Sequence, residues 1–396
     1  MDSVDAAGLG IGDKYPPRIM GVLNVSEESP YDPSVFDDPA AAARYVDEEL
    51  IDQGADIVDI GLESANKRFE VLTADEELER LDIALETIDR VSGEAIFSIE
   101  TRYAAVADAA LEAGFDMVND VCGFADPEMP TVCSEHDAAV VKMASPPDLK
   151  RPGAVEETDW AERKGEAWAE RADYVDMVYE ALKQNGLTEK TIVDPAFGGW
   201  SEAQTLEDDR ETFRRLSEFR ALGKPTLVSI NRKNFLGEIA GRETDKRLPV
   251  SLAATSMAVE RGADVIRTHD VAETRDAALI GSAFAERSSK SHGDLTVSRV
   301  GVSSTRELRA YLREREIDPT LATDWVHHAF EIEGLTPDEL THLGRVAGGC
   351  GAVWTEFASD AGLLVGSAGT IDHLSGQLRG ETERLSRLGE ALSRSR

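Results

Sequence analysis

The stretch QGADIVDIGLES, residues 53–64, decides the fold. A Gly after a helical segment ends the helix in a left-handed cap, and an apolar, β-branched run follows at once. The same turn chemistry recurs as AGFD at 113–116 and RGAD at 261–264, each before another apolar run. A helix that leads directly into a buried strand, repeated along the chain, is typical of β/α units with a parallel sheet.

Eight such runs lie between residues 18 and 285. They are RIMGVLNV (18–25), ADIVDIGLE (55–63), AIFSIET (95–101), FDMVNDV (115–121), AAVVKMA (138–144), KTIVDPAF (190–197), PTLVSIN (225–231) and ADVIRTHD (263–270). Each run is followed by enough chain for a crossover helix, and about 270 residues is the usual size of a TIM barrel. We therefore predict an α/β fold, a (β/α)8 TIM barrel. A doubly wound open sheet is the alternative, but no G-x-G-x-x-G follows the first run.

Segments of the chain precede and follow the predicted barrel. We predict an N-terminal extension at 1–17, the barrel at 18–287, a polar linker at 288–295 and a small α+β domain of unknown role at 296–396. In that last domain the pattern predicts a helix at 304–316, a strand at 327–335, a helix at 336–348 and a strand–turn–strand at 351–369. None of these segments carries a motif for chemistry.

Composition restricts the function. The 396 residues include 42 basic and 76 acidic side chains, a net charge of −34, with 41% hydrophobic and 30% charged residues. Such a chain has a sizeable core, and its charge repels nucleic acid and anionic membranes. No apolar stretch is long enough for a membrane helix, no secretory signal is visible, and the three cysteines fit neither a disulfide framework nor a zinc site. We expect a cytoplasmic protein.

The acidic residues are dispersed along the whole chain rather than gathered in a tail. A dispersed acidic surface keeps a protein soluble in a salt-rich cytoplasm, where screening weakens its self-repulsion. We therefore expect a halophilic protein.

Polar side chains stand at the ends of the predicted strands, where the active site of a TIM barrel lies. They are Asn24 on the first strand, Glu100 on the third, Asn119 and Asp120 on the fourth, Asp194 on the sixth, Asn231, Arg232 and Lys233 on the seventh, and Arg267, His269 and Asp270 on the eighth. The cations cluster on the seventh and eighth strands, where phosphate sites commonly lie in this fold. The pattern indicates a site for a donor-rich heterocycle joined to an anionic group.

Structural explanations compete for several of these residues. Asn24 could cap the loop that follows it, Asp194 before Pro195 could form a turn, and His269 could be a buried histidine with a purely structural role. Arg232 and Lys233 suit solvated surface charge. We favour the functional interpretation, because these cations follow a buried strand.

The motifs and their order resemble the dihydropteroate synthase family over residues 18–285. The matching segments are MGVLNVSEESPYD (20–32), GADIVDIGLESANKR (54–68), DEELER (75–80), FSIET (97–101), MVNDV (117–121), DPAFGGWS (194–201), NRKN (231–234) and RTHDV (267–271). That family joins a pterin carrying a CH2–O–pyrophosphate to the amino group of p-aminobenzoate and releases pyrophosphate. The resemblance implies a pterin-binding barrel enzyme of this type. The dispersed acidic residues add the expectation of a halophilic archaeal source, and residues 296–396 add an extra C-terminal domain.

The resemblance also implies roles for individual residues. Pterin contacts would come from Glu100, Asn119, Asp194 and Lys233, and pyrophosphate contacts from Asn24, Arg232, Arg267 and His269. Asn24 would also help to hold Mg2+, the expected metal cofactor. Lys233, Arg267 and His269 would be the catalytic residues. The arylamine side would be formed by Ala65, Asn66, Lys67, Arg68, Asn231 and Asn234. A homodimer is a further expectation from the resemblance.

The chain departs from the family chiefly around the amine nucleophile. Glu100 stands where the family has Asp, and residues 65–68 replace Thr-Arg-Pro-Gly. The arylamine therefore remains open between p-aminobenzoate and a related compound. Two other functions stay possible at this stage, a tetrahydropterin-dependent methyltransferase and a non-catalytic pterin-binding or assembly protein.

Overall fold

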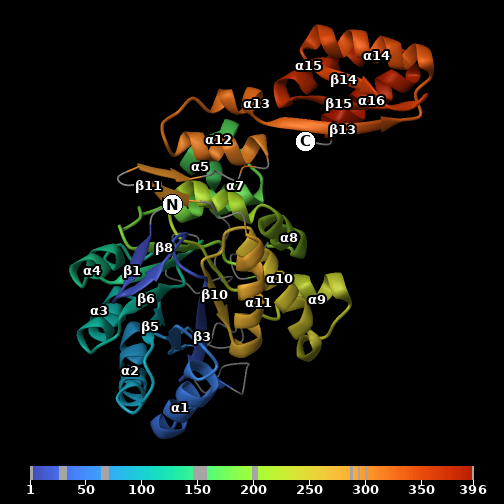
Figure 1. The fold of residues 1–396 in the computed structure, drawn as a ribbon. Helices are drawn as coiled ribbons and strands as arrows, with labels where there is room; N and C mark the ends of the chain where they lie inside the picture. Colours follow the sequence, from blue (N-terminus) through green and yellow to red (C-terminus); the bar gives the residue numbers. More distant parts are fainter. Residues whose placement is uncertain are drawn as a thin grey trace. The chain divides into compact units, whose positions relative to one another are not determined.

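The computed structural model describes residues 3–25, 34–63, 71–145, 158–198, 204–285, 289–292, 295–298, 302 and 304–394. Within it the chain divides into two compact units, Met1–Val297 and Ser298–Arg396 (Figure 1). Each unit has its own hydrophobic core.

The first unit is built on one parallel sheet. Its strands are β3 (Arg18–Asn24), β4 (Ile57–Gly61), β5 (Ile96–Thr101), β6 (Met117–Asp120), β7 (Ala139–Met143), β8 (Thr191–Asp194), β9 (Leu227–Val228) and β10 (Val265–Thr268). The strand order is β8-β7-β6-β5-β4-β3-β10-β9, and a parallel bridge between Val193 and Thr226 joins its two ends. This arrangement confirms the predicted (β/α)8 barrel.

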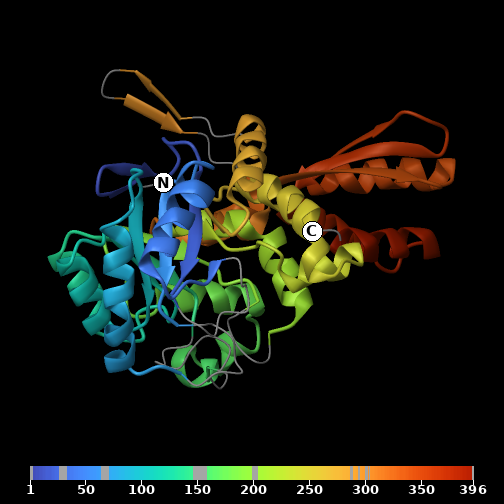
Figure 2. The same cartoon turned by 90° about the horizontal axis from the view of Figure 1, so that it is seen from below.

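Helices follow the strands and surround the barrel (Figure 2). They are α1 (Pro39–Tyr45), continued by the π-helix η2 (Val46–Ile51), α2 (Ala74–Ile88), α3 (Ala104–Glu112), α4 (Met129–Glu135), α5 (Trp160–Lys164), α6 (Glu166–Ala169), α7 (Tyr174–Lys183), α8 (Leu206–Arg214), the 3-10 helices η3 (Leu216–Leu222) and η4 (Thr244–Lys246), α9 (Asn234–Ala240), α10 (Leu248–Glu260) and α11 (Val271–Phe284). The helix α2 shows how the sequence sets a boundary. Its N-cap Thr73 and Glu76 form a reciprocal capping box.

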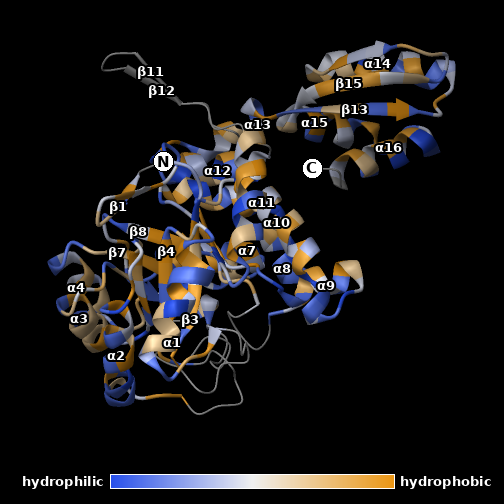
Figure 3. Ribbon diagram, turned by 60° about the horizontal axis from the view of Figure 1, so that its bottom comes forward, coloured by the Kyte–Doolittle hydropathy of each residue, from blue (hydrophilic) through white to orange (hydrophobic). Residues whose placement is uncertain are grey.

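Two apolar layers stabilise the barrel. One lies between strands and helices, and in Figure 3 the barrel strands are mostly orange while the helices around them carry both blue and orange segments. The other fills the barrel interior, where Met20, Ile57 and Val265 are buried. The N-terminal extension forms an unpredicted antiparallel hairpin, β1 (Val4–Ala6) and β2 (Leu9–Ile11), that packs into this inner layer.

The predicted linker, residues 288–295, contains β11 (Ser289–His292), which pairs in a two-stranded sheet with β12 (Leu295–Ser298). The second unit then contains α12 (Thr305–Arg313), η5 (Pro319–Leu321), α13 (Ala322–Trp325), β13 (His327–Glu333), α14 (Pro337–Cys350), β14 (Val353–Glu356), β15 (Ala361–Ser367), α15 (Ala368–Leu378) and α16 (Glu383–Arg394). Its strands form an antiparallel sheet in the order β13-β15-β14. This mixture confirms the predicted α+β character of the region.

Candidate active site

The register of the barrel brings the predicted site residues to one end. Asn24 on β3 pairs with Gly61 on β4, Gly61 pairs with Glu100 on β5, and Glu100 pairs with Asn119 on β6. These positions form one row across four strands at their carboxyl ends. Gly61 keeps the row open, because a Cβ there would lie 3.2 Å from Oδ1 of Asn24 and 3.8 Å from Oε1 of Glu100.

Arg267 on β10 is the central cation of the site. Its Nε donates to Oδ2 of Asp59 at 2.7 Å, and its Nη2 donates to Oε2 of Glu100 at 2.5 Å. Asn119 Nδ2 donates to the same Asp59 oxygen at 2.9 Å. The two carboxylates raise the pKa of Arg267, so the guanidinium stays charged despite its burial. Four strands thus contribute to one hydrogen-bonded cluster.

The longer side chain of Glu100 explains one contact of this cluster. It reaches Arg267 with 15% of its side chain exposed, whereas Asp59 is completely buried. Burial raises the pKa of Glu100, the charge of Arg267 opposes that rise, and the charge of Asp59 adds to it. Glu100 is therefore harder to ionise than an ordinary glutamate, although the charge of Arg267 opposes this.

Lys233 follows β9 and lies among carboxylates. Desolvation lowers its pKa, while the charges of Asp194 and Asp209 act in the opposite direction. Burial also raises the pKa of Asp194 to about 6, against the Ala196 N–H, which donates to its Oδ1 at 2.8 Å. A half-buried ammonium beside a buried carboxylate can hold a ring that has both acceptors and donors.

His269 lies beside the cations at the end of β10. Desolvation, together with the charges of Arg267 and Arg232, lowers its pKa to about 4. Its Nδ1 lies 3.4 Å from Oγ of Ser34, which also accepts a hydrogen bond from Nδ2 of Asn24 at 3.0 Å. The imidazole is therefore neutral near pH 7, and it can accept a proton when an anion comes close.

Arg232 has a different environment from Arg267. Its Nε and Nη2 donate to Asp270, each at 2.9 Å, and Nδ2 of Asn231 donates to the same carboxylate at 2.9 Å. Burial would raise the pKa of Asp270, but these hydrogen bonds outweigh burial and lower it. The positive charge of Arg232 is thus balanced within the protein.

Only some of the residues predicted for the arylamine side are among those that the structure describes. Asn234 begins α9, and its Oδ1 accepts from Nη1 of Arg247 at 2.8 Å, so its amide is engaged outside the Arg267 cluster. Ala65, Asn66, Lys67 and Arg68 lie outside the described residues.

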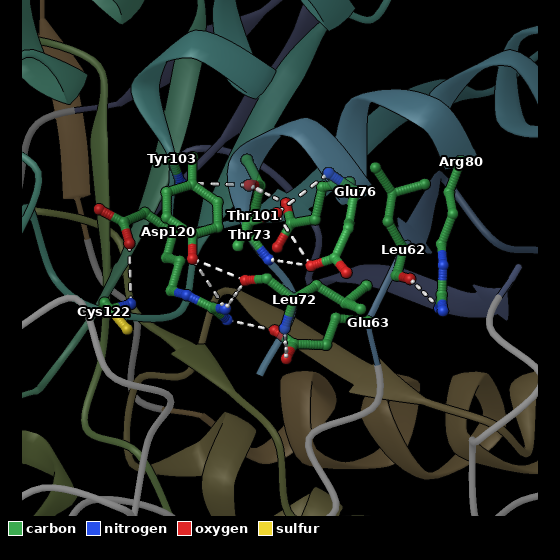
Figure 4. A network of polar contacts seen from close by, with 12 residues as sticks. Leu62, Glu63, Leu72, Thr73, Glu76, Arg80, Thr101, Tyr103, Asp120 and Cys122 are labelled. Carbon is green, nitrogen blue, oxygen red and sulfur yellow. Dashed lines mark hydrogen bonds and ion pairs between the residues drawn. The ribbon is translucent and has the colours of Figure 1, made fainter. Parts of the chain in front are cut away.

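A second polar network joins the ends of β4 and β5 to the start of α2 (Figure 4). The buried Arg102 forms an ion pair with Glu63 and donates to the Leu72 carbonyl at 2.7 Å. The Leu72 N–H donates to Glu63 Oε1 at 3.0 Å, and Tyr103 Oη donates to the Leu72 carbonyl at 2.7 Å. Residues 63 and 72 are thereby tied together on either side of the segment 64–70.

Sequence reasoning missed Asp59, Ser34 and Asp209. Asp59 left a signal, because a carboxylate in the middle of the apolar run IVDIG must find a partner when that strand is buried. Ser34 and Asp209 left none, since Ser34 lies ten residues beyond Asn24 in sequence and Asp209 lies within the helix α8. Among the described residues no group of three or more His, Cys, Asp or Glu side chains is arranged to hold a metal ion.

The chain is similar to known proteins over its barrel. A family model described as "Pterin binding enzyme" matches residues 20–269. The probable bifunctional folylpolyglutamate synthase/dihydropteroate synthase of Haloferax volcanii is 35% identical over 295 residues, covering 72% of this chain and 32% of that protein. The dihydropteroate synthase of Bacillus subtilis is 31% identical over 277 residues, covering 69% of this chain and 91% of that protein.

A solved structure agrees with these relatives. Dihydropteroate synthase from Clostridium difficile, crystallised in the presence of pteroic acid, superposes with a TM-score of 0.58 at 30% identity, covering 70% of this chain and 99% of that one. The chain spans about a third of the length of the bifunctional relatives from Haloferax volcanii and Halobacterium salinarum. No helix in the described part of the chain has the length and apolar character to span a membrane.

The fold and the site define a TIM-barrel protein with cations, carboxylates and amides gathered at the carboxyl ends of its strands. Within that class, the chain belongs to the pterin-binding enzyme family, to which the match over residues 20–269 assigns it.

Proposed function

We propose that this chain is a dihydropteroate synthase-type transferase. It would join 6-hydroxymethyl-7,8-dihydropterin pyrophosphate to the amino group of p-aminobenzoate or a related arylamine. The amine nitrogen forms a bond to the pterin CH2 carbon as the C–O bond to pyrophosphate breaks, and the nitrogen then loses a proton. The observation that carries the proposal is the Arg267 cluster, which combines a fixed cation with carboxylate and amide groups at the mouth of the barrel.

The leaving group needs stabilisation of its developing negative charge. Arg267 and the neutral His269 are the groups that would meet it, and such electrostatic stabilisation is usually the largest contribution of an active site. His269 can take up a proton beside the departing pyrophosphate, which would raise its pKa from about 4. Arg232 would contribute less than Arg267 to stabilising the leaving group, since its guanidinium is already paired with Asp270.

The pterin would be held by Asn119, Asp194 and Lys233. A carboxylate facing the 2-amino and N3–H donors of a pterin makes charge-assisted hydrogen bonds, and Lys233 can donate to a ring acceptor. Glu100 adds a carboxylate that is already paired with Arg267. Fixing the pterin CH2 group beside the amine lowers the entropic cost of the reaction.

The residues present fit a magnesium ion that is shared with the substrate. Mg2+ prefers oxygen ligands and commonly binds through one or two protein groups plus substrate phosphates and water. Nδ2 of Asn24 donates a hydrogen bond to Ser34. Oδ1 of Asn24, which faces Gly61, is therefore the atom that would coordinate the ion. Asn24 would therefore hold the ion, whose chemistry is to neutralise charge on the pyrophosphate.

A pyrophosphate-release assay tests the function. Purified protein in molar KCl would receive the pterin pyrophosphate, Mg2+ and p-aminobenzoate, and release should require the arylamine. A tetrahydropterin-dependent methyltransferase or a non-catalytic pterin-binding protein would release no pyrophosphate, and that result would reject the proposal. A matched comparison of Lys233→Ala with Lys190→Ala, a lysine that pairs with Asp137 at the start of β8, tests the site.

The arylamine is tested separately. If residues 65–68 alter its recognition, the double mutant Ala65→Thr, Asn66→Arg should use p-aminobenzoate better than the native protein does. If both proteins use p-aminobenzoate with the same kcat/KM, and that value is typical of an enzyme, the altered segment does not change the choice of arylamine.

We also propose that the protein is a cytoplasmic, salt-adapted homodimer. The helices α10 and α11 expose Met257, Leu279, Ile280 and Phe284, the last with 75% of its surface accessible. An exposed apolar patch of this kind suits contact with a second copy, and molar salt would screen the repulsion between two acidic chains. Light scattering should give a dimer mass that falls to a monomer in Ile280→Asp but not in the α9 control Ile239→Asp. A monomeric native protein would contradict this.

A further inference from the structure

Asp59 occupies the middle of β4 and is in contact with two predicted ligand residues. Its side chain is completely buried. Oδ2 accepts from Arg267 Nε at 2.7 Å and from Asn119 Nδ2 at 2.9 Å. These partners come from β10 and β6, which lie on different sides of β4 in the strand order. One carboxylate oxygen therefore links the groups expected at the pyrophosphate and at the pterin.

The other oxygen of Asp59 is not used for the fold. Among the described residues Oδ1 is buried and has no hydrogen-bond partner. A buried carboxylate with an unsatisfied oxygen carries a desolvation cost, and buried ion pairs can often be replaced by apolar groups without loss of stability. Stability alone therefore does not account for an acid at this position.

Other aspartates of the barrel have a different role. Oδ2 of Asp56, at the start of the same strand, accepts from the Ile19 N–H at 2.9 Å, and Oδ2 of Asp116 accepts from the Phe97 N–H at 2.8 Å. Both tie one strand to the next through the backbone. The hydrogen bonds to the Asp59 side chain within the described residues come instead from the side chains of Arg267 and Asn119.

We propose that Asp59 is a positioning residue for the proposed transfer reaction, because it fixes the orientations of Arg267 and Asn119 at once. This rests on the proposed function of the site. Asp59 uses the Nε–H of Arg267, and Glu100 uses one N–H of Nη2. A guanidinium has five N–H groups, so within the described residues these two hydrogen bonds leave three for an anionic ligand, in a direction that Asp59 sets.

Glu100 cannot replace Asp59 in this role. Its side chain is longer and partly exposed, and burial raises its pKa, so both its position and its charge can change. Asp59 is short and enclosed between neighbouring strands, with Val22 and Ser98 as its register partners. The fixed direction of Arg267 therefore comes from Asp59.

The test is Asp59→Asn, which keeps the shape of the side chain but replaces its charge by a neutral amide. The probe is 6-hydroxymethyl-7,8-dihydropterin pyrophosphate with Mg2+, and its affinity is measured by calorimetry in molar KCl. A binding group that is displaced by about 1 Å can lower the reaction rate by about 10²-fold. We therefore expect the probe affinity and kcat of Asp59→Asn to fall by about 10- to 100-fold. The KM for the arylamine should stay near its native value, because Arg267 and Asn119, which Asp59 orients, are expected at the pyrophosphate and the pterin.

Two comparisons separate positioning from a general structural effect. Asp56→Asn alters another Asp–Arg pair, that of Asp56 with Arg18 at the opposite end of the barrel, and should leave probe affinity unchanged. In an Arg267→Ala, Asn119→Ala background, Asp59→Asn should cause no further loss of affinity, because the residues that it orients are absent. Asp59→Ser serves as a second variant if Asp59→Asn does not fold, with thermal unfolding as the check.

The outcomes distinguish this inference from the proposed function. If the native protein does not bind the probe, the proposed function fails. If the native protein binds it and Asp59→Asn binds it equally well, the inference about Asp59 fails alone. An additional loss from Asp59→Asn in the Arg267→Ala, Asn119→Ala background would also overturn it.

Discussion

Replacing Arg267 by Ala should affect both catalysis and stability, with different dependences on pH. Arg267 is the partner of Asp59 at 2.7 Å and of Glu100 at 2.5 Å. Without it, two carboxylates remain in a buried cluster, and breaking a buried pair by removing one partner typically costs about 3–5 kcal/mol. The loss of one charge-stabilising group should also lower kcat by about 10²- to 10³-fold.

The pH dependence follows from Glu100. Burial already raises its pKa, and Arg267 is the charge that opposes this rise, so the pKa of Glu100 goes higher in the variant. A carboxyl group whose pKa is higher in the folded than in the unfolded state favours folding when it is protonated. That contribution is lost as the pH rises through the folded-state pKa. The stability deficit of Arg267→Ala should therefore be smaller near pH 5 than near pH 7.

The assay combines chemical unfolding in molar KCl with pyrophosphate release, each measured across that pH interval. Arg18→Ala is the matched control, because Arg18 pairs with Asp56 at 3.1 Å near the other end of the strands. It should lose some stability and keep its turnover rate. The reasoning is refuted if Arg267→Ala keeps a near-native rate, or if its stability deficit is the same at both pH values.

Further predictions follow from other residues. Lys233→Ala should lower turnover by about 10²- to 10³-fold while Lys190→Ala does not, as measured by pyrophosphate release. Activity should fall as the pH drops through about 6, where Asp194 becomes protonated, and a rate unchanged down to pH 5 would exclude its carboxylate from pterin binding. Glu77→Gln should raise the melting temperature at pH 8, because burial raises the pKa of Glu77 to about 7 and its ionised form opposes folding at higher pH. Glu76→Gln should lower the melting temperature at pH 8, because the hydrogen bonds from Thr73 that lower the pKa of Glu76 favour its ionised form in the folded protein. The melting temperature should also rise steeply between dilute and molar KCl, and a salt-independent value would contradict halophilic adaptation.

The barrel could be predicted because its strands carry strong local signals. Buried parallel strands appear as apolar runs such as IVDIG, and before three of the runs a Gly marks the end of the preceding helix. The polar residues at strand ends followed from the same pattern, since the carboxyl ends of parallel strands meet on one face. The N-terminal hairpin had no such signal, because its strands contain three residues each.

The pairing of charges could not be predicted, because it depends on closure of the barrel. Asp59 and Arg267 are 208 residues apart in sequence and meet only because β3 lies between β4 and β10. For the same reason nothing in the run NRKN indicated that Asp270 would bind Arg232 rather than leave it for a ligand. The assigned roles of Ala65, Asn66, Lys67 and Arg68 remain predictions from resemblance.

The most direct test of the proposed function is to quantify both products in one reaction. The native protein, with Mg2+ in molar KCl, would receive the pterin pyrophosphate and p-aminobenzoate, and mass spectrometry would measure the condensed pterin–arylamine while an enzymatic assay measures pyrophosphate. The account predicts that the two products appear together in equal amounts and that Lys190→Ala forms them at the native rate. A folded native protein that binds the pterin pyrophosphate but forms neither product with any arylamine would contradict it.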